Sequence, residues 1–234
     1  MSLNKNPEHI AIILDGNRRY ARKKGLSPWE GHRFGAEKVK DILQWAYDLG
    51  IRELTLYSFS MDNFNRPEKE KKELFGLFKK NIGKLKGNRK LKEHRIKVRF
   101  IGRLHMFPKD IQKEMSEVME ETKNYDKFKL NFAMAYSSKA EITDALKKII
   151  SKLKNKEISE EDITENLVNE NLYLSSSPDI LIRPGGEKRI SDFLLFQMAY
   201  SELFFLDKLW PEFTKGDLAK IIREFKRRER RFGR

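Results

Sequence analysis

Short apolar runs rich in β-branched residues alternate along this chain with longer segments in which apolar residues recur at helical spacing. The short runs predict six strands, of which the last is the weakest: Ile10–Leu14, Leu54–Phe59, Ile96–Ile101, Lys129–Ala135, Ile180–Arg183 and Leu203–Leu206. The longer segments predict helices at Gly35–Leu49, Pro67–Leu85, Lys109–Lys123, Lys139–Leu153, Glu160–Asn169, Ser191–Tyr200 and Lys215–Arg231. Such alternation is typical of an α/β fold, so we expect a central, mostly parallel sheet with helices on both faces.

The chain shows no sign of a division into separate domains. Its 234 residues are compatible with one α/β domain or with two small ones. The sequence contains no internal repeat and no low-complexity linker, and its most polar connection, Asn155–Glu161, is interpreted as a surface loop. We therefore expect a single domain over residues 1–234.

Charge narrows the class of partner. The formal net charge of +14 favours an anionic partner, which leaves nucleic acid, acidic lipid headgroups and phosphorylated small molecules as candidates. The absence of cysteine excludes disulfides and thiol chemistry. No helix-turn-helix, zinc-finger or RNA-recognition signature accompanies the basic residues, so we do not expect nucleic acid as the partner.

The ends of the chain bear on its location. Residues 1–6 lack the apolar core of a signal peptide, and no segment has the run of about 18 apolar residues that spans a membrane. We therefore expect a soluble, cytoplasmic protein. The basic segment 223–234 has a structural explanation, because cations stabilise a helix C-terminus. It also leaves open a peripheral contact with acidic lipids at the inner face of the membrane.

The most informative segment is residues 9–19, where an apolar run ends in Asp15 and Gly16 and continues into Arg18 and Arg19. If the run is a buried strand, Asp15 lies at the carboxyl edge of the sheet, where open α/β folds bind ligands. A carboxylate can bind Mg²⁺, a glycine lets the backbone approach a ligand closely, and arginines bind phosphate oxygens. The segment indicates a diphosphate–metal site, with a solvated Asp-Gly turn as the alternative.

Further polar clusters lie near the ends of other predicted strands. Each cluster by itself has a structural explanation as turn residues or surface charges. Because the carboxyl ends of parallel strands meet at one edge of a sheet, we expect their side chains to share a cleft. The residues expected there are Asp15, Asn63, Arg66, Arg183, Arg189 and Glu202.

Segment Pro67–Leu85 begins beside the polar cluster Ser60–Pro67, which follows the predicted strand Leu54–Phe59, and is amphipathic, with apolar residues at roughly helical spacing. Core packing explains this pattern, and the sequence alone favours that explanation. A second interpretation is one wall of a hydrophobic tunnel. A charged head site next to an apolar wall is what an isoprenoid diphosphate requires.

The segments that carry these clusters resemble the cis-prenyltransferases, the undecaprenyl diphosphate synthase family. His9–Tyr20, Leu54–Pro67 and Asp179–Phe205 are similar to three signatures of that family, and Leu209-Trp210-Pro211 and Arg231-Phe232-Gly233 match it as well. The resemblance extends from about residue 7 to the end of the chain. The forms Asp-Gly-Asn-Arg-Arg-Tyr and Glu-Gly-His-Arg are more similar to archaeal and eukaryotic members than to typical bacterial ones.

The resemblance implies a Mg²⁺-dependent prenyltransferase. Such an enzyme condenses isopentenyl diphosphate repeatedly onto an allylic primer, farnesyl or geranylgeranyl diphosphate, and makes each new double bond cis. The product is a long-chain polyprenyl diphosphate, the precursor of a lipid carrier for glycan synthesis. The implied architecture is a homodimer whose subunits each contain a six-stranded parallel sheet and an apolar tunnel.

The resemblance also implies roles for individual residues. It assigns catalysis to Asp15 and Asn63, and Mg²⁺ binding to Asp15 and Glu202. The diphosphate of the primer would be surrounded by Gly16, Asn17, Arg18, Arg19, Tyr20 and His32. The primer site would be lined by Ser60, Met61, Asp62, Phe64 and Arg66. Isopentenyl diphosphate would be bound by Arg183, Arg189, Ile190 and Ser191, while Arg231 and Gly233 would reach the site of the neighbouring subunit.

The proton released after each condensation needs an acceptor, and the family's proposed acceptor corresponds to Asn63. A neutral amide is a poor base, so we favour a positioning role for Asn63. A diphosphate oxygen or His32 is then the nearer acceptor.

Three positions depart from the family pattern. Pro28 stands where many bacterial members have an arginine that contacts diphosphate, so that contact is missing. Lys188 stands where many have a histidine proposed to bind metal, and a charged lysine cannot do so. Ser137-Ser138-Lys139 replaces a common Gly-Gly-Arg.

Three alternative functions remain open from the sequence. A non-catalytic regulatory subunit would be expected to lack the metal-binding acid, whereas Asp15 and Asn63 are both present. A basic nucleic-acid-binding protein would bind with strong salt dependence and without need of Mg²⁺. A third alternative keeps the fold but transfers the prenyl group to another acceptor in a single step. The Asp-Asp-x-x-Asp motif of the all-helical trans-prenyltransferases is absent.

Overall fold

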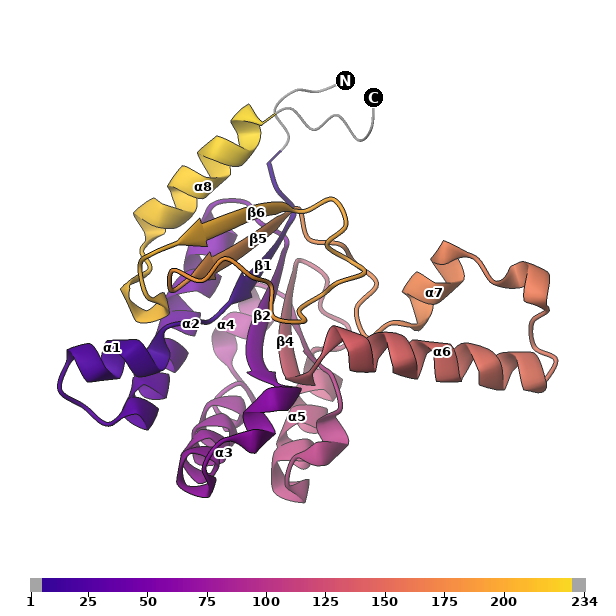
Figure 1. Cartoon of the computed structure of the whole chain (residues 1–234), viewed down its shortest axis with the longest axis horizontal. Coiled ribbons are helices and arrows are strands. Elements are labelled where there is room, and N and C mark those ends of the chain that lie inside the picture. The colour runs from indigo at the N-terminus through magenta and orange to yellow at the C-terminus, as the bar shows by residue number, and fades with distance from the viewer. Residues whose placement is uncertain (1–5, 229–234) are drawn as a thin grey trace.

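Six parallel strands form the centre of the protein, in the order β3-β4-β2-β1-β5-β6 (Figure 1). The computed structural model describes residues 6–228. The strands are β1 His9–Ile13, β2 Glu53–Ser60, β3 Ile96–Ile101, β4 Phe128–Tyr136, β5 Ile180–Pro184 and β6 Glu202–Leu206. Each predicted strand is therefore confirmed to within one residue at either end, and the expected parallel sheet is confirmed.

Most of the predicted helices are present. The helices are α1 Asn17–Lys23, α2 Gly31–Asp48, α3 Glu68–Gly83, α4 Arg89–Glu93, α5 Lys109–Thr122, α6 Ser138–Lys154, α7 Glu165–Asn171 and α8 Lys215–Arg227. The helix predicted at Glu160–Asn169 is divided into a 3₁₀ turn at Glu160–Asp162 and α7. The pattern missed α1 and α4, because 7 and 5 residues are too few to display a helical period.

The predicted helix at Ser191–Tyr200 is wrong. The structure has irregular turns there, and Ser191, Asp192 and Leu194 have φ values of 49°, 59° and 48°. Left-handed backbone at three positions cannot belong to a right-handed α-helix. The apolar residues that suggested helical spacing are nevertheless buried, with Phe193 and Leu194 fully inaccessible. Their burial comes from packing on the sheet.

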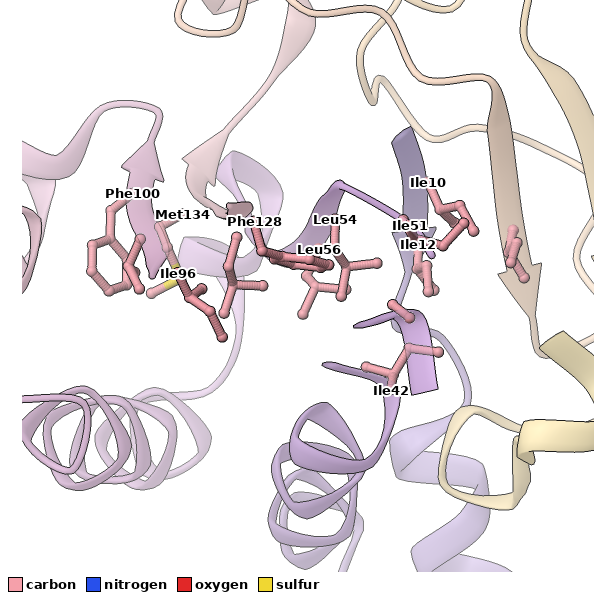
Figure 2. Packing of buried hydrophobic residues seen from close by; sticks show 14 of the residues in the cluster. Ile10, Ile12, Ile42, Ile51, Leu54, Leu56, Ile96, Phe100, Phe128 and Met134 are labelled. Carbon is pink, nitrogen blue, oxygen red and sulfur yellow. The ribbon is translucent and has the colours of Figure 1, made fainter. Parts of the chain in front are cut away.

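Alternate residues of β1 face opposite sides of the sheet, as the two-residue repeat of a strand requires. Ile10 and Ile12 belong to the larger core cluster, together with residues of α2, α3, α4, α5 and α8. Figure 2 shows this side, where Ile42 of α2 lies below the side chains of the sheet. Ala11 and Ile13 face the smaller cluster on the other side. Because β1 is buried on both faces, its sequence is apolar throughout.

The second face of the sheet differs from the expectation of helices on both sides. Its cluster is completed by residues of the two irregular segments that flank β5, namely Leu174 from residues 172–179, and Phe193, Leu194 and Met198 from residues 185–201. α6 begins beside the second of these segments and then extends away from the sheet together with α7 (Figure 1). The two irregular segments thus cover this face, and the second leads from β5 past the candidate site.

Candidate active site

Asp15 lies two residues beyond the end of β1, at the carboxyl edge of the sheet. Its carboxylate accepts hydrogen bonds from two arginines, 3.1 Å from Arg19 Nη2 and 2.8 Å from Arg183 Nη2. The Arg183 side chain is 5% exposed, whereas that of Arg19 is 41% exposed. The structure therefore brings together the acid and the arginine that the sequence places 168 residues apart.

Two glycines permit the close packing around Asp15. Gly16 has a φ of 104°, and a Cβ there would lie 2.9 Å from Leu209 Cδ2. Gly185 has a φ of 105°, and a Cβ there would lie 2.7 Å from Arg19 Nη2. Arg19 Nη1 in turn donates to the carbonyl of Gly185 at 2.5 Å. Any larger residue at these two positions would be strained and would displace the groups around the carboxylate.

The Arg183 guanidinium is oriented by the loop that follows β5. Its Nη1 donates to Ser191 Oγ at 2.8 Å and to the carbonyl oxygen of Arg189. The Arg189 side chain contacts Glu187 Oε2 at 2.5 Å and lines the same cavity as Asp15. Arg183, Arg189 and Ser191 thus gather at one place, as the sequence predicted.

A second group of charges surrounds Glu70, which is 3% exposed and lies in the first turn of α3. Its Oε1 lies 3.1 Å from His32 Nε2 and 3.0 Å from Arg66 Nη1, and its Oε2 lies 3.8 Å from Arg18 Nη2. Sequence reasoning missed Glu70. The available signal was its position four residues after Arg66, the spacing at which opposite charges meet on a helix.

Burial and hydrogen bonding shift the pKa values in this group. Burial lowers the pKa of His32 and outweighs the hydrogen bond to Glu70, which acts in the opposite direction. Burial disfavours ionisation of Glu70, but the His32 hydrogen bond and the charges of Arg66 and Arg18 outweigh it and lower the pKa of the carboxyl. His32 is therefore neutral and Glu70 ionised at pH 7. His32 Nε2 also lies 3.3 Å from Arg66 Nη1, so this nitrogen either donates to Glu70 or accepts from Arg66, depending on the tautomer.

The turn after β2 is a 3₁₀ helix at Met61–Asn65. Asn63 Oδ1 accepts a hydrogen bond from Ser60 N at 3.1 Å, so the Asn63 amide stabilises this turn. Ser60, Asp62, Asn63 and Arg66 line the cavity that also contains Asp15. The side chains of two other predicted residues, Met61 and Phe64, pack against the core.

The cavity has a volume of about 980 Å³, a polar end around Asp15 and apolar walls, and it is also lined by further charged residues such as Lys40, Lys84 and Lys90. Asp15, Asn17 and His32 are at the polar end, with the residues of the turn and of the β5 loop. The apolar walls come from α2, α3 and the sheet, and include Val39, Leu43, Leu74, Leu77, Phe78, Ile82, Phe100, Phe132 and Met134. The amphipathic face of α3 therefore serves both interpretations given to it, core packing and cavity wall.

Glu202 does not join Asp15 within one chain. It is the first residue of β6 and is in register with Ile180 of β5, which pairs with Ile10 of β1. Asp15 is thus five positions further along the strand direction, a distance of about 16 Å at the usual rise per residue. Glu202 instead forms an ion pair with Arg228 Nη1 at 2.7 Å. The prediction that Glu202 lies in the cleft of its own chain is wrong, because Glu202 is at the beginning of its strand and the cleft is at the ends of the strands.

The remaining predicted residues are near the site without lining the cavity or lie outside the described residues. Tyr20 packs edge-to-face against Phe34, with ring centroids 5.3 Å apart. Ile190 packs against the smaller core cluster. Arg231 and Gly233 lie outside residues 6–228, and their predicted role in a neighbouring subunit stays a prediction.

The donor set fits Mg²⁺ that arrives with a diphosphate. Within residues 6–228 no group of three or more His, Cys, Asp or Glu side chains forms a metal-binding cluster. Mg²⁺ is commonly bound by one or two carboxylates together with substrate phosphates and water, so Asp15 supplies a sufficient protein ligand. The adjacent arginines match the remaining diphosphate oxygens in charge and geometry.

A parallel sheet that carries a site suited to a diphosphate next to an apolar cavity is typical of enzymes that act on prenyl diphosphates. The family model described as "Putative undecaprenyl diphosphate synthase" matches residues 13–233. The chain belongs to this undecaprenyl diphosphate synthase family, which confirms the resemblance found in the sequence.

Individual relatives support this assignment. The chain is 47% identical over 230 residues to the tritrans,polycis-undecaprenyl-diphosphate synthase (geranylgeranyl-diphosphate specific) of Pyrococcus furiosus, covering 97% of this chain and 87% of the relative. A crystal structure of lavandulyl diphosphate synthase from Lavandula x intermedia with dimethylallyl diphosphate has a TM-score of 0.91 at 31% identity, covering 98% and 99% of the two chains. A probable undecaprenyl diphosphate synthase from Campylobacter jejuni has a TM-score of 0.81 at 29% identity, covering 98% and 100%.

Proposed function

We propose that this protein is a cis-prenyltransferase that elongates an allylic diphosphate primer with isopentenyl diphosphate to a long-chain polyprenyl diphosphate. The observation that carries this proposal is the continuity of the arginine-rich end at Asp15 with an apolar cavity of about 980 Å³. The name of the Pyrococcus furiosus relative favours geranylgeranyl diphosphate as the primer and an undecaprenyl product.

The charged residues have separable roles in this reaction. Cleavage of the allylic C–O bond leaves negative charge on the departing diphosphate, and Arg19, Arg66 and Arg183 are placed to stabilise it. Mg²⁺, bound through Asp15, would neutralise further charge on that diphosphate. The alkene of isopentenyl diphosphate then attacks the allylic carbon, and a proton leaves the new prenyl unit.

The structure favours a positioning role for Asn63. Its oxygen already accepts a hydrogen bond from Ser60 N, so the amide fixes the turn that lines the cavity. The neutral His32 ring has one basic nitrogen, and Glu70 and Arg66 both contact its Nε2. A diphosphate oxygen and the basic nitrogen of His32 are the two acceptors we propose for the proton.

The experiment is incubation of the full chain with labelled isopentenyl diphosphate, Mg²⁺ and either farnesyl or geranylgeranyl diphosphate, followed by sizing of the lipid products. We expect long prenyl products, more of them from geranylgeranyl diphosphate, and none when the metal is chelated. A product one condensation long would overturn elongation and favour single-step transfer. Absence of any product would favour the regulatory-subunit alternative.

Oligomeric state and location are part of the same proposal. We propose a homodimer, because Glu202 lies far from Asp15 of its own chain and a metal site containing both acids would need a second subunit. Light scattering coupled to size-exclusion chromatography tests this directly. No helix within residues 6–228 is long and apolar enough to cross a membrane. We propose a cytoplasmic enzyme that delivers its lipid product by peripheral contact with the membrane.

A further inference from the structure

The loop that orients Arg183 has an unfavourable backbone conformation. Ser191, whose hydroxyl accepts from Arg183 Nη1, and its neighbour Asp192 both have left-handed φ values, 49° and 59°. Non-glycine residues adopt this conformation only where the surrounding contacts enforce it. Contacts outside the loop must therefore hold Ser191 in place.

Tyr57 Oη on β2 donates to the Ser191 carbonyl at 3.4 Å, and Asp192 supplies further contacts by binding the beginning of α6. Its Oδ2 accepts from the hydroxyl of Ser137 at 2.5 Å, and its Oδ1 accepts from Lys139 N at 3.2 Å. Its own carbonyl accepts from Ser138 N at 2.9 Å. Three hydrogen bonds of Asp192 thus join the loop to the helix. The four residues that form them do not line the cavity.

The hydroxyls of Ser137 and Ser138 both form hydrogen bonds in this junction. Ser137 is the N-cap of α6, so its Oγ accepts from Ala140 N at 3.2 Å while its hydroxyl proton goes to Asp192. Ser138 Oγ accepts from Leu195 N at 2.8 Å, further along the same loop. The side-chain part of the junction therefore depends on this chain's own serines.

We propose that Asp192 is a positioning residue for the diphosphate site. By binding Ser137 and Lys139 it holds Ser191 in its left-handed conformation, and Ser191 orients the Arg183 guanidinium toward Asp15 and the cavity. The inference rests on the proposed function, since it assigns Arg183 and Ser191 to isopentenyl diphosphate. Asp192 itself binds no substrate.

Steady-state kinetics of Asp192→Ala test the proposal. We expect the KM for isopentenyl diphosphate to rise about tenfold, as the loss of hydrogen bonds to a charged group implies, with less than about a threefold change in the KM for the primer. Asp192→Asn keeps an acceptor for Lys139 N and should restore most of the affinity. Ser137→Ala removes one bond of the same junction, so it should be milder and should add little to Asp192→Ala.

The matched control is Asp162→Ala, which breaks a Ser–Asp pair with Ser159 on the surface, at 3.0 Å, and should leave both KM values unchanged. The proposal is overturned if Asp192→Ala changes the KM for isopentenyl diphosphate less than twofold. It is also overturned if both KM values rise equally with a lower melting temperature, or if Asp192→Asn is as impaired as alanine. If Asp192→Ala does not fold, the KM values of Asp192→Asn and Ser137→Ala test the proposal in its place.

A binding measurement separates this proposal from the proposed function. If the wild-type chain makes no prenyl product, the proposed function fails, but the affinity for inorganic pyrophosphate can still be measured by calorimetry. A decrease of about tenfold in Asp192→Ala, with recovery in Asp192→Asn, would support positioning of an anion site. Equal affinity in all variants would overturn it.

Discussion

Replacing Asp15 with asparagine is predicted to have opposite effects on diphosphate binding and on turnover. In the free protein both carboxylate oxygens of Asp15 are engaged by arginines, at 3.1 Å from Arg19 and 2.8 Å from Arg183. A diphosphate that arrives without metal must compete with the carboxylate for these same donors and is also repelled by its charge. Asparagine removes both obstacles, but it also removes the metal ligand.

The structure sets the size of the effect. A hydrogen bond to a charged group contributes about 1.5–3 kcal/mol when it is well shielded from water, which applies to the Arg183 pair. The more exposed Arg19 pair contributes at most about 0.5 kcal/mol. We therefore expect metal-free pyrophosphate to bind Asp15→Asn between about tenfold and a hundredfold more tightly than the wild type. Turnover with Mg²⁺ should fall at least about a hundredfold.

Isothermal titration with inorganic pyrophosphate, in EDTA and in excess Mg²⁺, measures the first effect, and product formation measures the second. Asp126→Asn is the control, because it removes an exposed carboxylate that pairs with Arg95 Nε at 2.7 Å on another part of the surface. It corrects for the change in net charge. The reasoning is refuted if Asp15→Asn binds metal-free pyrophosphate no better than the wild type, or if its turnover stays within tenfold.

Leu74→Trp places a larger side chain in the apolar end of the cavity, so products should become shorter on sizing, and unchanged lengths would contradict the cavity's role. Glu70→Gln removes the counter-charge of the partly buried Arg66 and the carboxylate beside the neutral His32, and should lower the free energy of unfolding by about 2 kcal/mol in urea titrations. Burial lowers the pKa of His9, so acidification below pH 6.5 protonates it only in the unfolded chain and lowers stability. His9→Gln should abolish up to about 1.4 kcal/mol of that loss between pH 7.5 and 5.5, and an equal loss in both proteins would be contrary evidence.

The strands could be predicted well because both faces of the sheet are covered, so that a buried strand is apolar along its whole length. Ile10, Ala11 and Ile12 are fully inaccessible, so apolar character continues without interruption and marks the strand clearly. The same reasoning located Asp15, since a polar residue after such a run must lie at the sheet edge. What the sequence could predict was therefore each strand and the chemistry immediately after it.

The irregular segment after β5 could not be predicted, because its conformation depends on distant partners. Ile190, Phe193, Leu194 and Met198 are spaced as in a helix, yet they pack against the sheet, and Ser191, Asp192 and Leu194 have left-handed backbone. Glu141 of α6 is 1% exposed and accepts hydrogen bonds from Gln197 Nε2 in this segment and from Leu174 N before β5, at 3.1 Å each, so it joins the chain on both sides of β5. These contacts between residues far apart in the chain override local propensity.

The place of β1 in the sheet has a consequence for biosynthesis. β1 lies between β2 and β5, so one of its edges stays unpaired during synthesis until residues beyond 180 have been made. Arg183 is made with that same later strand. A nascent chain therefore lacks this arginine of the diphosphate site until β5 has been made, and until then the unpaired edge of β1 is open to pairing with other chains.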